Sequence, residues 1–429
     1  MWQKMWHLLR GHSSRGDTFQ PLYKLEQLAG LSRLPVIQVR AFIADRGETA
    51  NGLPGPGVGG ILASLLRRDL TFTRRVSVTG GEDSGYLAPA ARSAASHDEM
   101  LTNGADSNSV IVGYLQSNDP ARIELRIRLF PRRGKEGSDG DLVVPITPGR
   151  LTALSPSIAK KVAERLDLAI TADVAQRWQQ HIPTSWEGLL RAGRCWEQRD
   201  WRGIVRLIEA GEIHPDALAP LSDDTPDSQA SRRGLELANA QEPDNPQLAF
   251  NRFCSIWNGN ERPAPHLEAI LRAGLAAGPG HGKSHMVLPH ILVLNKQNVP
   301  FILAHSEVAY RLLRNNSFAL ANFSQYLGQL APQDERILSI VFETIELDPD
   351  NPSGYVNAVD ALLKGKRPAD ALKVAESLLE LCTPPLSDRT MYCFRQNPAG
   401  AAAIDRGEFD PHQFAIEFLK RTHSLARGQ

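Results

Sequence analysis

Three glycines near the start of the chain have the spacing of a dinucleotide-binding loop. Gly55, Gly57 and Gly60 satisfy the pattern G-x-G-x-x-G, and Glu82 follows about 20 residues later. In such a loop the glycines directly follow a strand, so that the N–H groups at the start of the next helix face the pyrophosphate. Here a Gly- and Pro-rich connection separates the glycines from the strand pattern that ends near Phe42. The sequence therefore favours a structural role, with a nucleotide- or dinucleotide-binding enzyme or sensor as the alternative.

A second glycine-rich segment precedes three closely spaced histidines. Residues 278–284 lack the first glycine of a phosphate-binding loop, because Ala277 stands at that position, and they follow a helical pattern instead of a strand. A turn between two helices is predicted. His281, His285 and His290 have a spacing that would let two imidazoles share a metal ion. No cysteine or carboxylate accompanies them, so neither a metal site nor a cofactor is expected.

Composition and charge exclude a general attraction to polyanions. The chain has 429 residues, of which 42% are hydrophobic, and its 48 basic residues balance 48 acidic ones. A net charge of zero gives no overall field that would recruit nucleic acid or an anionic membrane. Basic pairs occur at residues 67–68, 74–75 and 132–133 without interleaved aromatic residues. We interpret these pairs as solvated ends of helices and strands, not as a nucleic-acid site.

Cysteine usage and hydropathy indicate a cytoplasmic protein without a membrane span. No stretch approaches the ~20 apolar residues that cross a bilayer. The cysteines are far apart and have no metal-binding or redox spacing, which indicates reduced thiols. The length predicts two or three domains. The four cysteines are Cys195, Cys254, Cys382 and Cys393.

The first third of the chain predicts a small sheet domain with helices packed on it. Residues 122–130 alternate apolar and charged side chains, as expected for a strand with one buried face, and residues 140–147 supply its hairpin partner. Mixed strand and helix patterns in this order are typical of an α/β domain. Strands are predicted over residues 34–43, 75–79, 109–115, 122–130 and 140–147, and helices over 58–70, 96–102 and 151–168.

This order resembles the TolB amino-terminal-type domain of bacterial signalling proteins, which tetratricopeptide repeats commonly follow. The resemblance covers residues 34–170 and is carried by the helix over 59–69, the short strand after it, and the segment 104–114 before the alternating strand. One departure is the opening strand, which ends at Phe42 without the usual Leu-Pro-Phe-like sequence. The resemblance implies a non-catalytic sensory or docking module and transfers no functional residue.

Residues 351–381 resemble a tetratricopeptide repeat, a unit of about 34 residues that forms two antiparallel helices. Tyr355 stands at the aromatic position that opens the first helix. Two departures are Val359, where glycine is usual, and the closing proline, which is displaced to Pro384. The small or apolar positions that must face the partner helix are Ala358, Leu362, Ala371, Ala375 and Leu378.

The boundary between two repeats recurs in the sequence. The segment from Asp348 to Pro352 and the one from Glu242 to Pro246 share an acid, a proline, and Asp-Asn-Pro. The first proline stops a helix, the asparagine can cap the next helix, and the second proline suits its first turn. Residues 214–234 are rich in Pro, Asp and Ser and predict a loop. Helix pairs are predicted over 184–197 and 201–210, 247–257 and 266–276, 284–294 and 300–313, 318–327 and 334–347, and 389–394 and 412–423.

We therefore expect a fold of the α+β/α type, in which a small α/β sheet domain precedes an α-helical, tetratricopeptide-like solenoid. The expected divisions are an N-terminal helical extension over residues 1–32, the TolB-like domain over 33–170 and the repeat domain over 171–429. Stacked helix pairs produce a large binding surface, so the expected function is a non-catalytic scaffold or regulatory protein that binds protein partners. By spacing, the residues expected to face a partner in the groove are Asn322, Gln325, Asn357 and Asp360.

Overall fold

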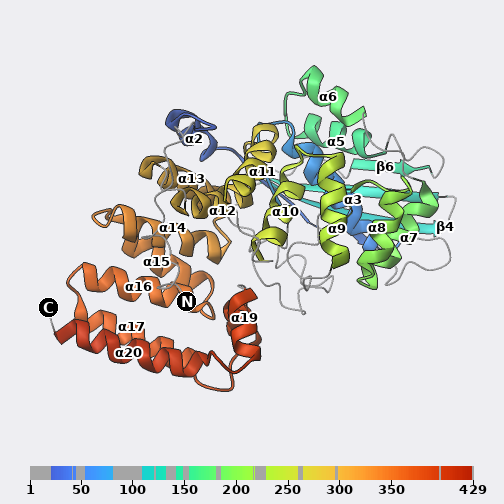
Figure 1. Ribbon diagram of the computed structural model, residues 1–429. Coiled ribbons are helices and arrows are strands. Elements are labelled where there is room, and N and C mark those ends of the chain that lie inside the picture. Colours follow the sequence, from blue (N-terminus) through green and yellow to red (C-terminus); the bar gives the residue numbers. More distant parts are fainter. Residues whose placement is uncertain are drawn as a thin grey trace. The chain divides into compact units, whose positions relative to one another are not determined.

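The computed structural model forms two compact units (Figure 1). The sheet unit contains the described residues from Arg33 to Ser284, and the helical unit contains residues 21–32 together with those from His285 onward. The division along the chain falls inside helix α12 (Gly282–Leu294). The structure describes residues 21–40, 42–44, 54–80, 109–119, 122–131, 142–147, 154–179, 185–215, 217, 229–258, 264–294, 298–395 and 398–427.

A mixed sheet forms the centre of the sheet unit. Its order is β3-β1-β4-β5-β6, and β2 pairs with the later part of β4. β1 is parallel to β3 and β4, whereas β4, β5 and β6 are antiparallel neighbours. Ile123, Leu125 and Ile127 of β5 are buried, which confirms the predicted alternation. The strands are β1 (Val36–Val39), β2 (Ile43–Ala44), β3 (Ser77–Gly80), β4 (Ser109–Asp119), β5 (Arg122–Pro131) and β6 (Leu142–Ile146).

Helix α3 (Pro56–Thr71) is buried on nearly all sides. It contacts β1 to β4 and also α5 and α7, so it has no solvated face of the kind that a surface helix shows (Figure 1). One continuous hydrophobic cluster joins the sheet, α3 and α5 to residues of α7, α8, α9 and α10. The other helices of this unit are α5 (Leu154–Arg165), α6 (Ala172–Gln179), α7 (Trp186–Glu197), α8 (Trp201–Glu209), α9 (Gln229–Gln241), α10 (Pro246–Asn258) and α11 (Ala264–Ala277).

Part of the predicted loop over residues 214–234 is helical. Helix α9 begins at Gln229 and buries Leu235 and Ala238 in the hydrophobic cluster. The polar sequence at its start gives no apolar periodicity, so the packing of its second half decides the structure.

The helical unit is built from consecutive helices that contact one another. α13, α14, α15, α16 and α17 each contact the next, and α14 also contacts α16. Within the residues that the structure describes, no helix is both long and apolar enough to cross a membrane. The predicted helix positions here are confirmed, and α19 is an addition to them. The helices are α2 (Leu25–Leu31), α13 (Val299–Leu312), α14 (Ser317–Leu330), α15 (Arg336–Leu347), α16 (Pro352–Lys364), α17 (Pro368–Leu381), α18 (Asp388–Arg395), α19 (Pro398–Asp405) and α20 (Pro411–Arg427).

The small or apolar positions of the predicted repeat over residues 351–381, which lie on α16 and α17, are all buried. Ala358, Leu362, Ala371, Ala375 and Leu378 each have 0% exposure. A helix pair packs this closely only where such side chains are small or fill the interface. The burial pattern predicted for the pair is therefore confirmed.

Candidate functional site

The glycines of the G-x-G-x-x-G pattern lie where two helices meet. Among the described residues, the last strand before the glycines is β2, which ends at Ala44, and α3 begins at Pro56. A Cβ added at Gly57 would lie 2.1 Å from the carbonyl oxygen of Gly193 in α7. One added at Gly60 would lie 3.4 Å from the ring of Trp196, also in α7. The missing side chains thus allow α7 to approach α3.

A carboxylate stands at the start of α3, where the nucleotide alternative needs an anion site. Gly55 is the N-cap residue of this helix, and the N–H of Gly57 donates to Oε1 of Glu197 at 3.0 Å. A phosphate at this position would meet a group of like charge, which disfavours its binding. Glu82, the other residue of the predicted fingerprint, lies outside the described residues. The local geometry gives the glycines a packing role.

Residues 278–284 form the predicted turn between two helices. α11 ends at Ala277 and α12 begins at Gly282. A Cβ at Gly280 would lie 2.7 Å from the carbonyl oxygen of Val76, so this glycine permits a close approach to the start of β3. The buried Lys283 places its Nζ 5.7 Å from the centroid of the Phe250 ring. Two contacts thus hold the turn in place: the close approach of Gly280 to Val76, and that of the Lys283 ammonium group to the ring of Phe250.

The three neighbouring histidines do not converge on one point. His281 contacts a serine and a glutamine through its two ring nitrogens. His285 lies against His305, with 2.8 Å between the Nδ1 atoms, and His290 contacts the hydroxyl of Tyr326. Among the described residues, no group of three or more His, Cys, Asp or Glu side chains could hold a metal ion. These histidines connect helices to one another.

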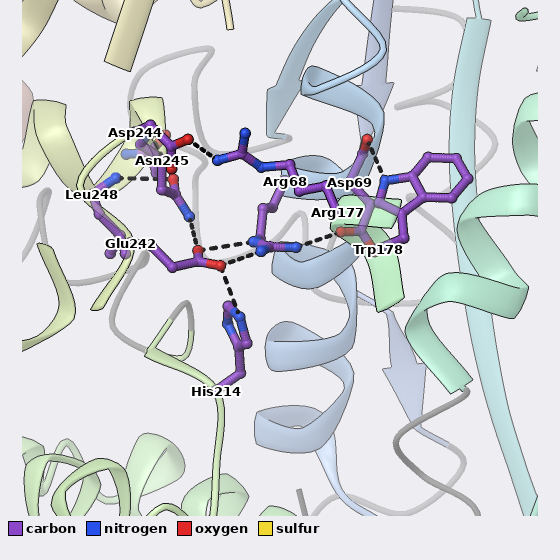
Figure 2. Close-up of polar contacts among 10 residues, drawn as sticks. Arg68, Asp69, Arg177, Trp178, His214, Glu242, Asp244, Asn245 and Leu248 are labelled. Carbon is purple, nitrogen blue, oxygen red and sulfur yellow. Dashed lines mark hydrogen bonds and ion pairs between the residues drawn. The ribbon is translucent and has the colours of Figure 1, made fainter. Parts of the chain in front are cut away.

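A buried network of charged side chains surrounds Arg68 in the sheet unit (Figure 2). This guanidinium donates from Nε to Oε2 of Glu242 at 2.9 Å and from Nη2 to Oε1 of the same carboxylate. Its Nη1 lies 2.7 Å from Oδ1 of Asp69, whose side chain is fully buried. Two-point contact between a guanidinium and a carboxylate is among the strongest hydrogen-bonded arrangements in proteins. The network therefore connects α3 to the turn that follows α9.

The carboxylate of Glu242 has two further partners (Figure 2). Nε2 of His214 lies 3.2 Å from Oε1, and Nδ2 of Asn245 donates to Oε2 at 2.9 Å. Burial alone would raise the pKa of Glu242, but His214 and Arg68 outweigh it and hold the pKa far below its usual value. Glu242 is thus an ionised structural acceptor at neutral pH. It is not poised to exchange protons in catalysis.

The same turn is attached to α6 through a second ion pair. Arg177 pairs with Asp244, and its guanidinium carbon lies 3.8 Å from the ring centroid of Phe72. The indole N–H of Trp178 donates to the backbone oxygen of Asp69 at 3.1 Å (Figure 2). These contacts attach α6 and the α9–α10 turn to the C-terminal part of α3.

A related arrangement occurs in the helical unit, at the turn between α15 and α16. The guanidinium of Arg389 pairs with Asp348, with Nε 3.2 Å from Oδ1. The hydroxyl of Ser317 donates to Oδ2 of Asp348 at 2.7 Å and accepts from Nδ2 of Asn351 at 3.2 Å. Burial opposes ionisation of Arg389, but its hydrogen bond to Asp348 raises the pKa of Arg389 above the usual value. This network joins α14, α16 and α18.

Two of the predicted partner-facing residues contact neighbouring helices, and a third pairs within its own helix. Nδ2 of Asn357 in α16 donates to the carbonyl oxygen of Ala321 in α14 at 2.8 Å. Asn322 lies 3.5 Å from Nε2 of His290 in α12, so both asparagines help to connect first helices. Asp360 is exposed and pairs with Lys364, 2.7 Å away.

The remaining predicted partner-facing residue, Gln325, is half-buried on α14. It belongs to the same helix as Asn322 and Ala321, which contribute to these interhelical contacts. The structure thus places the four predicted residues on two helices in contact, α14 and α16.

Three cysteines have thiol groups of low reactivity. Burial raises the pKa of Cys382 to about 11 and that of Cys393 to about 12. Burial, with Asp200 nearby, also raises the pKa of Cys195. The thiolate is the reactive form of cysteine, so these three side chains are poor nucleophiles at neutral pH.

Sequence reasoning missed the network around Arg68 because it interpreted the pair at residues 67–68 as solvated. Arg68 has 5% exposure, and its partner Glu242 is 174 residues away. The available signal was the apolar residues on every side of α3, which leave no solvated face for a charged side chain. Residues 132–133, another of the basic pairs, lie outside the described residues.

Comparison with known proteins does not assign the chain to a family. No protein-family model matches the sequence, and the search of curated proteins found no match.

Proposed function

We propose that this chain is a non-catalytic scaffold or regulatory protein that binds a protein partner through its helical repeats. In this proposal the first helices of successive pairs, α12, α14 and α16, form a tetratricopeptide-like groove. The resemblance of the N-terminal region to the TolB amino-terminal type extends the proposal to a cytoplasmic assembly in bacterial signalling. The sheet unit would then be the sensory or docking module of that assembly.

The observation that carries the proposal is a constant offset in the contacts between first helices. Asn357 contacts Ala321, 36 residues earlier, and Lys364 donates to the carbonyl oxygen of Gly328, also 36 residues earlier. Tyr326 contacts His290 at the same offset of 36 residues. An offset of one repeat length, preserved from one pair to the next, is what a stack of equivalent repeats produces. Such a stack presents one continuous face to a partner.

The same contacts divide the predicted groove residues by role. Asn322 and Asn357 help to hold first helices together, so changing them would disturb the stack as well as a partner. Asp360 is exposed and Gln325 is half-buried. Contacts on a binding surface concentrate their energy in a few residues, and these two are the better probes of it.

The test uses the full chain, because residues 1–170 would lose part of the hydrophobic cluster that α7 to α10 complete. The tagged chain is used to capture partners from the native host, and these are identified by mass spectrometry. Gln325→Lys combined with Asp360→Lys is compared with Glu376→Lys, an exposed position on α17. Circular dichroism and thermal melting establish that each variant is folded.

We expect one partner to be retained by the wild type and by the Glu376→Lys control. The double variant should capture about tenfold less of this partner, because a loss of about 1.4 kcal/mol of binding free energy weakens the affinity tenfold. Equal retention by all three proteins would exclude this face as the partner site.

A further inference from the structure

Two imidazoles, those of His285 and His290, lie on the part of α12 that belongs to the helical unit. His285 has 0% exposure and His305 of α13 has 3%. Their Nδ1 atoms are 2.8 Å apart and their rings are stacked, with centroids separated by 5.0 Å. The ring of His285 also stacks on that of Tyr23, just before α2, with 6.4 Å between the two ring centroids. A hydrogen bond between two Nδ1 atoms requires one N–H and one lone pair, so at least one of these rings must be neutral.

The second imidazole connects α12 to α14. The hydroxyl of Tyr326 lies 2.5 Å from Nδ1 of His290, and the side chain of Asn322 lies 3.5 Å from Nε2. Burial raises the pKa of Tyr326, so the phenol keeps its proton and donates it to Nδ1. That bond uses the lone pair of a neutral imidazole, which an imidazolium no longer has. Burial correspondingly lowers the pKa of His290 to about 4.

The surrounding elements offer few opposite charges to an imidazolium. Beyond Lys283, neither α12 nor α14 contains an Asp, Glu, Lys or Arg residue. The carboxylate of Glu307 on α13 is 3.7 Å from Arg311 and 3.1 Å from Arg336. The two charged residues of the α2 segment are exposed. The charged groups on these elements and on the helices that contact α14 are Lys24, Glu26, Lys283, Glu307, Arg311, Arg336, Glu343, Glu346, Asp360 and Lys364.

We propose that α12 is an acid-sensitive element, in which protonation of His290 and of the His285–His305 pair loosens its packing on α13 and α14. Protonation of His290 removes the acceptor of the Tyr326 hydroxyl and places a positive charge at the interface. A first proton on the pair preserves its N–H to N bond but places a charge at a buried position. A second proton removes the bond and sets two like charges side by side. Pro289 lacks a backbone N–H and already interrupts the hydrogen bonding of this helix.

The direction of the effect follows from proton linkage. His290 binds a proton more weakly when packed than when exposed, so acidification favours the loosened state. Its contribution to stability is complete above pH 6.5 and is lost as the pH falls towards 4. With these two values, the opening equilibrium at pH 5 is about 20-fold larger than at pH 7.

Hydrogen exchange of the full chain, followed by mass spectrometry at pH 7.5 and pH 5, tests the proposal. Rates are corrected with an unstructured reference peptide. We expect protection of peptides from residues 285–330 to fall about 10- to 30-fold at pH 5, given the linkage above. Peptides from residues 336–381, which contain no histidine, should change little and serve as the internal control. Equal protection of both regions at the two pH values would overturn the proposal.

Variants assign the effect to the named imidazoles. His290→Gln retains an oxygen that accepts from Tyr326 but does not titrate, and His285→Asn with His305→Gln retains an amide pair. Each variant is expected to reduce the pH dependence of hydrogen-exchange protection in residues 285–330, whatever the stability of that variant at pH 7.5. His423→Gln, at an exposed histidine of α20, is the matched control and should behave as the wild type. An unchanged pH dependence in both test variants would assign the effect to other groups and refute the proposal.

Discussion

Two nearly identical segments of this chain, Glu242–Pro246 and Asp348–Pro352, have the same local structure but different distant partners. In each, an acid is followed by Pro-Asp-Asn-Pro, the asparagine is buried, and its Oδ1 accepts from N–H groups of the next helix. In each, the acid pairs with a largely buried arginine. The first arginine comes from α3 in the sheet unit (Figure 2), and the second comes from α18 in the helical unit. The segment determines the turn, and tertiary packing determines what the acid holds.

The surroundings of the two ion pairs suggest unequal consequences when they are broken. Arg68 lies on a helix enclosed by the sheet and other helices, and it also contacts the fully buried Asp69. Arg389 lies on the short helix α18, and each acid keeps a further donor, Ser317 at Asp348 and Asn245 at Glu242. Removing one member of a buried pair leaves the other charge buried without a partner. The cost in folding free energy is larger where fewer neighbouring groups can rearrange around that charge.

The largest effect is expected for Arg68→Met. This change leaves Glu242 and Asp69 buried without their guanidinium, and should lower the free energy of unfolding of the sheet unit by about 3–5 kcal/mol. Five of the tryptophans, at positions 178, 186, 196, 201 and 257, lie in the sheet unit, so urea unfolding followed by tryptophan fluorescence reports on it.

Arg389→Met is the matched change in the helical unit. It should leave the fluorescence transition in place and increase hydrogen exchange in α18 and in the α15–α16 turn. If both variants shifted the tryptophan transition by a comparable amount, the Arg68–Glu242 and Arg389–Asp348 ion pairs would be equivalent, and the expected difference between them would be refuted.

A second and smaller difference should appear in the pH dependence of Glu242→Gln. The pKa of Glu242 in the folded chain is below its ordinary value of 4.5. The unfolded chain therefore binds the extra proton below that pH, and the stability contributed by the carboxylate is lost as the pH falls. The gap in unfolding free energy between wild type and variant should narrow by about 2 kcal/mol between pH 7 and pH 3.

The measurement is the same urea titration at pH 7, 5, 4 and 3, with tryptophan fluorescence as the signal. Asp348→Asn, in the helical unit, is the control for a lost carboxylate elsewhere in the chain and should not change this transition. A gap between wild type and Glu242→Gln that stays constant with pH would contradict the assignment of Glu242 as an ionised anchor.

How far the sequence predicts this molecule depends on the distance over which the deciding interaction acts. The turn at Asp348–Pro352 was predictable because a proline and a capping asparagine act within a few residues. The burial of Ala371 and Ala375 was also predictable, since helical spacing places them on one face. The environment of Arg68 was not, because its partner is 174 residues away and its neighbour Arg67 gives the same local pattern.

The candidate groove residues show the same division. Spacing placed Asn322 and Asn357 on the first helices of their pairs, and those helices are present at the predicted positions. That Asn357 would donate to the backbone of α14 depends on how closely the two helices approach, which spacing within one helix does not determine. For the glycines, likewise, the sequence contained the pattern, whereas the contact of Gly57 with Gly193 depends on the packing of α7.

The smallest effects on stability should come from the two capping asparagines. Substitutions there test the difference between the two segments at the level of single hydrogen bonds. Asn245→Ala and Asn351→Ala each remove an acceptor at the start of a helix, which costs about 1 kcal/mol. Replacement by aspartate preserves the acceptor but removes the amide donor. At position 245 the new carboxylate faces Oε2 of Glu242, now 2.9 Å from the amide nitrogen, whereas at 351 it faces the hydroxyl of Ser317.

Like charges at that distance repel, whereas the single O–H of Ser317 can rotate from Asp348, which keeps Arg389 as a donor, to the new carboxylate. Asn245→Asp should therefore be more destabilising than Asn245→Ala, while Asn351→Asp should be less destabilising than Asn351→Ala. Urea titration by fluorescence for position 245, and hydrogen exchange of α16 for position 351, measure the two orders. The same order at both positions would mean that the acid of the first segment is not the group that the cap faces, and the comparison of the two anchors would fail at its most local contact.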